Sequence, residues 1–216
     1  MDPQIWTDVD VDVQTALATA IPASGISKAN PAVVSATAHG LSDGAVVLVR
    51  CRGINGLDWT VAEVDDSDTD SFKLKGIDTS GAKGTFVSGS VQAITFGASA
   101  STLQEVTPSG GESADVPIST IHQIPDYSIP GKPTPLVFAF GSLWVPDDPA
   151  LVELAKASKV KAVRAVRFSW PDGTQGLFAG IPSVSMAPGG TSGNPVTTPV
   201  KINVRGPFTA YAGTAV

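Results

Sequence analysis

The chain has 216 residues, of which 42% are hydrophobic and 16% are charged, and this charged share lies below the roughly 25% of average globular proteins. Its formal net charge of −6 argues against a protein that reads nucleic-acid sequence, because such proteins gain affinity from clustered Lys and Arg side chains. A single cysteine excludes an intramolecular disulfide, and a chain of this length can bury one core, or one core and a small satellite domain.

The N-terminal segment 1–24 is predicted to be an acidic arm that leads into the first part of a core. It contains four aspartates and neither Lys nor Arg, which is not the pattern of a secretory signal peptide. The run TALATA (15–20) could begin a short helix, which Pro22 and Gly25 would end. Since the sequence also lacks an apolar run of about twenty residues, we expect a soluble product of the cytoplasm that does not insert into membranes.

Residues 25–94 carry short runs of β-branched and alternating residues separated by turn signals. PAVVSAT, AVVLVRC, DWTVAEV and SFKLKGI are the runs, and Gly, Asn and Asp cluster between them. A strand about every ten residues is typical of a small all-β barrel or sandwich. We therefore predict a compact β module at 25–94, of a size near the lower limit for an independent core.

The segment that follows gives weak signals. LQEV (103–106) offers one strand, whereas STIHQIPDYSIPGKPTP (119–135) contains four prolines and no hydrophobic periodicity. Proline is excluded from helix interiors and from central strands. We therefore predict a long loop at 109–134, and loops of that length usually have a contact function or are disordered.

The last third of the chain has the clearest pattern. TPLVFAFGSLW reads as a strand, and a helix is predicted at 148–160 because Asp148 suits the N-cap and Pro149 the first helical position. A hairpin with its turn at 171–173 and a Thr/Val-rich strand from 195 onward complete the pattern. Together these elements predict an antiparallel sheet with one helix packed on it.

No arrangement of residues points to catalysis, to a cofactor or to a metal ion. His39 lies in a Gly-rich turn and His122 in the proline-rich segment, and neither belongs to a catalytic motif. Cys51 is expected to be a small buried residue. The acidic clusters at 8–13 and 65–70 could bind a cation such as calcium, but their spacing matches no known loop, so we expect a solvated strand and a solvated turn.

Several motifs in the second half resemble one known family. These are the helix segment FAFGSLWVPDDPALVEL, the hairpin RAVRFSWPDGTQGLFAG, the closing strand PVTTPVKINV and the RGP that follows. Across about residues 100–211 they resemble the major tail tube protein of long, flexible, non-contractile bacteriophages (siphophages). The opening MDPQIWTDVDVDVQTAL is similar to N-terminal arms of such proteins, and the 25–94 block resembles a small β module found in phage tail proteins.

The resemblance implies a structural virion protein of the phage tail, with no enzymatic activity. The implied fold is mainly β, a tail-tube-type antiparallel β-sandwich or barrel with one packed α-helix and a small all-β domain inserted at 25–94 between the arm (1–24) and the core (95–216). Subunits of the family form hexameric rings that stack into a tube. The implied partners are other copies of the chain, the tape measure protein, the tail tip or initiator and terminator proteins, and DNA that passes transiently through the lumen.

Five apolar residues are the candidates for contacts between subunits, because they have no local partner in the sequence: Ile5, Trp6, Tyr127, Ile129 and Pro130. Packing onto their own subunit is the alternative. Two other functions stay open from the residues. A phage tail fibre or baseplate adhesin would use the 25–94 module for binding, whereas a small cytosolic hydrolase would need a nucleophile and a base, which the sequence does not offer.

Overall fold

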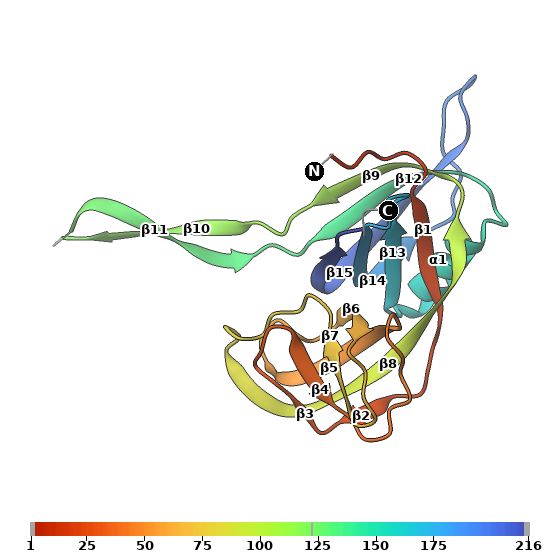
Figure 1. The fold of residues 1–216 in the computed structure, drawn as a ribbon. Coiled ribbons are helices and arrows are strands. Elements are labelled where there is room, and N and C mark those ends of the chain that lie inside the picture. Colours follow the sequence, from red (N-terminus) through yellow and green to blue (C-terminus); the bar gives the residue numbers. More distant parts are fainter. Residues whose placement is uncertain (1–2, 122, 214–216) are drawn as a thin grey trace.

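The computed structural model describes residues 3–121 and 123–213 as a mainly β structure with one helix and a long projecting hairpin (Figure 1). The helix is α1 (Pro149–Val160). The strands are β1 (Asp10–Leu17), β2 (Ile21–Ala23), β3 (Gly25–Ile26), β4 (Ala32–Ser35), β5 (Val46–Ile54), β6 (Thr60–Asp65), β7 (Ser71–Leu74), β8 (Gly84–Ala100), β9 (Leu103–Ser109), β10 (Ser113–Thr120), β11 (Gln123–Pro133), β12 (Val137–Leu143), β13 (Arg164–Ser169), β14 (Gln175–Val184) and β15 (Thr197–Tyr211).

One long sheet runs through most of the described chain. Its strand order is β3-β4-β7-β6-β5-β8-β1-β13-β14-β15-β12-β9, with β2 paired to β8 beside this path. All of its pairs are antiparallel. The predicted fold class, antiparallel β with one packed helix, is therefore confirmed, and the sheet does not close into a barrel.

Strand β8 joins two packing units because it is long enough to belong to both. Its first part, up to Ala93, pairs with β5, and its last part, from Ile94, pairs with β1. The lower unit in Figure 1 contains the module of residues 25–94 with strands β3 to β7, together with β2, which directly precedes it in the sequence. The upper unit is the core, which contains β1, β9, β12 to β15 and α1.

The core unit buries aromatic and aliphatic side chains between its curved sheet and α1. Phe138 and Phe140 alternate inward on β12, and Val200 and Ile202 do the same on the paired strand β15. Phe138 stacks on Phe178 with ring centroids 4.7 Å apart. The module has a separate cluster of its own, to which β5 contributes Val47, Val49 and Cys51 and β7 contributes Phe72 and Leu74.

A third, smaller cluster docks the module on the core sheet. Leu48 and Val61 of the module pack with Ala165, Leu177 and Ala179 of β13 and β14. The Tyr211 hydroxyl, at the end of β15, accepts a hydrogen bond of 2.9 Å from the backbone N–H of Glu63 in β6. The module is therefore held by an apolar face as well as by the continuous strand β8.

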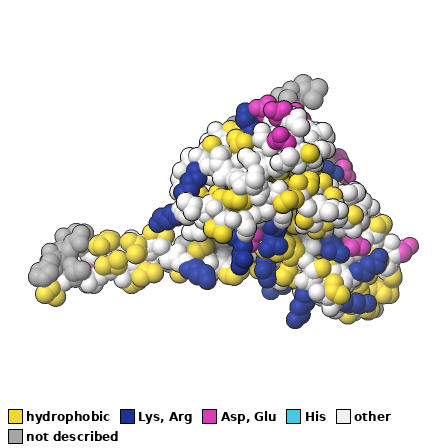
Figure 2. All heavy atoms as spheres, turned by 90° about the horizontal axis from the view of Figure 1, so that it is seen from below, with side chains coloured by type: hydrophobic (Ala, Val, Ile, Leu, Met, Phe, Trp, Pro, Cys, Tyr) yellow, Lys and Arg dark blue, Asp and Glu magenta, His cyan; other side chains and the backbone are white. Residues whose placement is uncertain are grey.

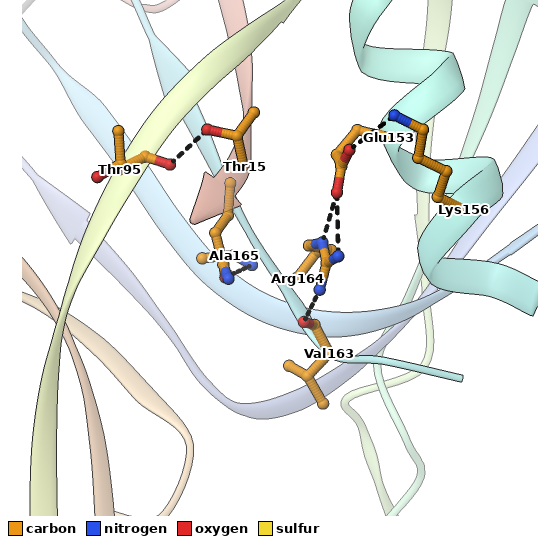
Figure 3. A network of polar contacts seen from close by, with 8 residues as sticks. Thr15, Thr95, Glu153, Lys156, Val163, Arg164 and Ala165 are labelled. Carbon is orange, nitrogen blue, oxygen red and sulfur yellow. Dashed lines mark hydrogen bonds and ion pairs between the residues drawn. The ribbon is translucent and has the colours of Figure 1, made fainter. Parts of the chain in front are cut away.

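The helix is held by one contact at its N-terminus and by a second contact at Glu153, near its middle. Asp148, which is only 3% exposed, accepts a 3.0 Å bond from the Leu151 N–H through Oδ1, and its Oδ2 accepts from the Ser101 N–H at the β8–β9 corner. Figure 3 shows the second attachment, in which the Arg164 guanidinium donates to Glu153 Oε1 at 3.0 Å while Lys156 approaches Oε2 of the same carboxylate. Since Arg164 starts β13, this pair ties α1 to the sheet.

Two segments differ from the sequence-based expectation. TALATA does not begin a helix, because residues 10–17 form β1, which lies between β8 and β13 and buries Val11 and Val13. The predicted loop at 109–134 is instead largely the hairpin of β10 and β11. Its prolines are tolerated because both strands of a two-stranded hairpin are edges, so every second N–H points away from the partner strand.

Candidate subunit interface

The hairpin of β10 and β11 is a two-stranded sheet of its own that projects from the core (Figure 1). Its register pairs Val116 with Ile129 and Ile118 with Tyr127. Directly opposed residues share one face of a hairpin, and so do residues two apart along a strand. These four apolar side chains therefore lie together on one face, which we call the hairpin's apolar face.

The apolar face has no core of its own to cover it. Val116, Tyr127 and Ile129 keep 46%, 46% and 44% of their surface exposed. The opposite face carries Asp115, Pro117, Ser128 and Pro130. Hydrophobic side chains are visible along the projecting hairpin in Figure 2. An isolated hairpin is marginally stable in water, and a contiguous exposed apolar face marks an interaction surface.

A free sheet edge is the second feature of this region. Strand β9 pairs with β12 along one side, and its other side has no strand partner among the described residues. The backbone N–H and C=O groups of such an edge are available for pairing with another chain.

A groove of about 390 Å³ separates this part of β9 from the N-terminal segment. Its wall on the β1 side is formed by Trp6, Asp8, Val9 and Val11, and its wall on the β9 side by Leu103, Gln104, Glu105 and Val106. The acidic residues of this lining, Asp8 and Glu105, are exposed, whereas its aliphatic residues are half-buried or buried.

The N-terminal segment is seated on its own core. The Trp6 ring meets Phe168 edge-on at 5.5 Å between centroids and lies 5.3 Å from Trp170. It still keeps 57% of its surface exposed, and Ile5 keeps 67%. Trp6 therefore has a partner within its subunit and a free surface for another contact.

The five candidate contact residues thus fall in three places. Tyr127 and Ile129 lie side by side on the hairpin's apolar face, whereas Pro130 lies on the opposite face. Ile5 and Trp6 belong to the N-terminal segment near the groove. The sequence reasoning missed Val116 and Ile118, although their spacing of two residues is the signal of a strand with one apolar face.

His39 and Cys51, the described residues that could suggest catalysis, are both held within the folded module. His39 Nδ1 accepts a 3.0 Å bond from the Leu41 N–H, so the proton resides on Nε2, which faces the Ser71 carbonyl oxygen at 3.3 Å. Cys51 is buried, and this burial raises the pKa of its thiol. His122 lies outside the described residues.

Within the described ranges, His, Cys, Asp and Glu side chains form no group of three or more that could hold a metal ion. None of the helices found there is both long enough and apolar enough to cross a membrane.

A family model described as "Phage tail tube protein, TTP" matches residues 52–213, which is about three quarters of the chain. The match begins inside the 25–94 block, so it includes β6 and β7 of the module as well as the core. No curated protein matches the chain.

Proposed function

The chain belongs to the phage tail tube protein family, and from that premise we propose that its subunits form hexameric rings that stack into the tube of a siphophage tail. The family is structural, so the chain is a component of the virion tail that assembles with copies of itself. The observation that carries the finer proposal is the hairpin's apolar face, which projects from the subunit and stays about half exposed among the residues that the structure describes.

Contact between successive rings is assigned to this hairpin. Full burial of side chains such as Val, Ile and Tyr stabilises by roughly 1.5–3 kcal/mol each, so two pairs of apolar residues supply a substantial contact. Tyr127 and Ile129 are on the face that would be buried. Pro130 would contact a neighbour only if the opposite face of the hairpin is also covered.

Contact within a ring is assigned to the free edge of β9. Strand pairing between neighbouring subunits would satisfy the backbone groups of that edge and remove an aggregation hazard. The N-terminal segment with Ile5 and Trp6 lies near the same edge, and the exposed part of Trp6 would pack on the neighbour. Stacking of rings through a head-to-tail contact continues without closing, which produces a filament.

The module at 25–94 is proposed to be an insertion that faces outward from the tube. Its docking through Leu48, Val61 and Tyr211 supports a rigid position on the core sheet. The lumen would hold the tape measure protein before it conducts DNA during ejection, and tip or initiator and terminator proteins would cap the two ends. Synthesis in the bacterial cytoplasm precedes assembly.

The test is negative-stain electron microscopy of the purified protein at high concentration. Hollow tubes with regularly spaced rings and outward knobs are expected. If only compact single particles form, even after the tape measure and initiator proteins are added, the tube proposal is wrong and the tail fibre or adhesin alternative gains support.

A further inference from the structure

The module carries a basic, polar depression that the proposed assembly does not use. It lies over paired strands β5 and β8, has a volume of about 360 Å³, and is lined by Arg50, Cys51, Arg52, Asp58, Ser88, Gly89, Ser90 and Gln92. The register places Arg50 opposite Ser90 and Arg52 opposite Ser88. Two guanidinium groups and two hydroxyls therefore share one face of the β5–β8 ribbon.

Arg50 is held in a fixed orientation. Its Nε donates to Asp58 Oδ1 at 2.9 Å, and its guanidinium lies 3.6 Å from the centroid of the Trp59 ring. The same Oδ1 also accepts a bond from the Cys51 N–H. The Nη atoms of Arg50 and the Oδ2 atom of Asp58 have no hydrogen-bond partner within residues 3–121 and 123–213, so they are available to a ligand.

Arg52 adds a second cation to this face. It is exposed and forms no ion pair with any residue that the structure describes. Two positions along a strand place the Cα atoms of Arg50 and Arg52 about 7 Å apart on the same side. The charged side chains that line the depression are two arginines and one aspartate, so its local charge is opposite in sign to the net charge of −6 of the chain.

We propose that this face binds an acidic sugar chain, a polymer of sugar units that carry carboxylate or phosphate groups. The two guanidinium groups would bind the acidic groups through charge-assisted hydrogen bonds. Asp58 Oδ2 can only accept, so it suits a ligand that also brings hydroxyl donors. Ser88 and Ser90 can donate to or accept from the same hydroxyls.

A nucleic acid fits this face less well. Single strands bind through bases stacked on exposed aromatic rings, whereas the Trp59 ring is already covered by Arg50. A DNA backbone also offers no hydroxyl donor that could hydrogen-bond to the Asp58 carboxylate. The combination of anion and hydroxyl groups therefore favours the sugar chain.

The test is isothermal titration calorimetry of the full chain with an oligogalacturonate, with a neutral dextran oligosaccharide of equal length and with a single-stranded oligonucleotide. Binding of the oligogalacturonate alone is expected. Arg52→Ser should weaken it about tenfold, because a charge-assisted hydrogen bond is lost. Arg50→Lys should also weaken it, although the charge is kept, because Lys cannot present the stacked planar fork.

The matched control is Lys28→Ser, which removes the same charge from an exposed site elsewhere in the module. Binding should be unchanged in this variant. The proposal fails if the oligogalacturonate does not bind, if Lys28→Ser weakens binding as much as Arg52→Ser, or if the oligonucleotide binds as tightly. Because calorimetry reports on the module and electron microscopy on assembly, failure here leaves the tube proposal standing, and the reverse also holds.

Discussion

The module and the projecting hairpin are built from similar alternating strands, yet the module buries its apolar residues whereas the hairpin exposes them. The module has enough strands to enclose a cluster in which Val47, Val49 and Phe72 are almost fully buried. The hairpin has two strands, which cannot enclose anything, and Tyr127 and Ile129 stay about half exposed. The module therefore buries its apolar residues within its own strands, whereas the hairpin leaves Tyr127 and Ile129 available for the contact between rings proposed above.

The largest effect on the subunit is expected inside the module. Phe72 is 1% exposed and packs against the His39 ring, so Phe72→Ala leaves a cavity and should lower the free energy of unfolding by about 3–5 kcal/mol. Denaturant unfolding followed by circular dichroism measures this change. Val87→Ala, at a site 73% exposed on β8, should change it by less than about 0.5 kcal/mol, and equal losses in both variants would refute an independent module core.

A smaller loss of stability is expected from ionisation of Tyr211, where the module docks on the core. Burial raises the pKa of Tyr211 to about 12, above the value of about 10 in an unfolded chain. The folded state therefore favours the neutral phenol, so the stabilisation is complete below about pH 10, falls as the pH rises from 10 to 12, and is lost above 12. We expect this loss to be at most about 3 kcal/mol, because each pKa unit corresponds to about 1.4 kcal/mol.

The variant Tyr211→Phe isolates this contribution from other groups that titrate in the same range. It leaves the Glu63 N–H without its partner, which should cost about 1 kcal/mol at pH 7. The difference in the free energy of unfolding between wild type and variant should then shrink as the pH rises from 10 to 12, and it should vanish or change sign within that range. A difference that stays constant across that range would contradict the buried, neutral phenol.

The smallest effect on the subunit is expected in the hairpin. Ile129→Asp places a charge on an exposed face that belongs to none of the three hydrophobic clusters, so the free energy of unfolding should change by less than about 0.5 kcal/mol. The same denaturant measurement serves as the check. A loss of 2 kcal/mol or more would mean that the hairpin supports its own subunit.

The sequence predicted the elements whose signals are local. The helix was predicted because Asp148 and Pro149 mark its start. In the structure the Asp148 carboxylate accepts a hydrogen bond from the Leu151 N–H. The module strands follow from alternation and turns. By contrast, residues 15–17 were misread because insertion of β1 between two other strands overrode a weak helical preference.

The hairpin shows that the number of prolines in a segment does not decide whether it forms a loop or a strand. Four prolines indicated a loop. Proline is excluded only from strand positions whose N–H must pair, however, and in a two-stranded hairpin half of the N–H groups have no partner strand. Tyr127 and Ile129 were chosen because they are apolar and have no local partner in the sequence, whereas Val116 and Ile118 could be recognised only from the strand register. The contact of Tyr211 with Glu63 joins residues 148 positions apart, and no local pattern predicts such a pair.

The most direct test of the hairpin as the contact between rings is electron microscopy of Ile129→Asp beside Val87→Asp, at the concentration at which the wild-type protein forms tubes. Both positions are exposed and apolar, so both variants should stay folded. We predict tubes from Val87→Asp and only free subunits or single rings from Ile129→Asp. Full-length tubes from Ile129→Asp would show that the apolar face of the hairpin does not join the rings.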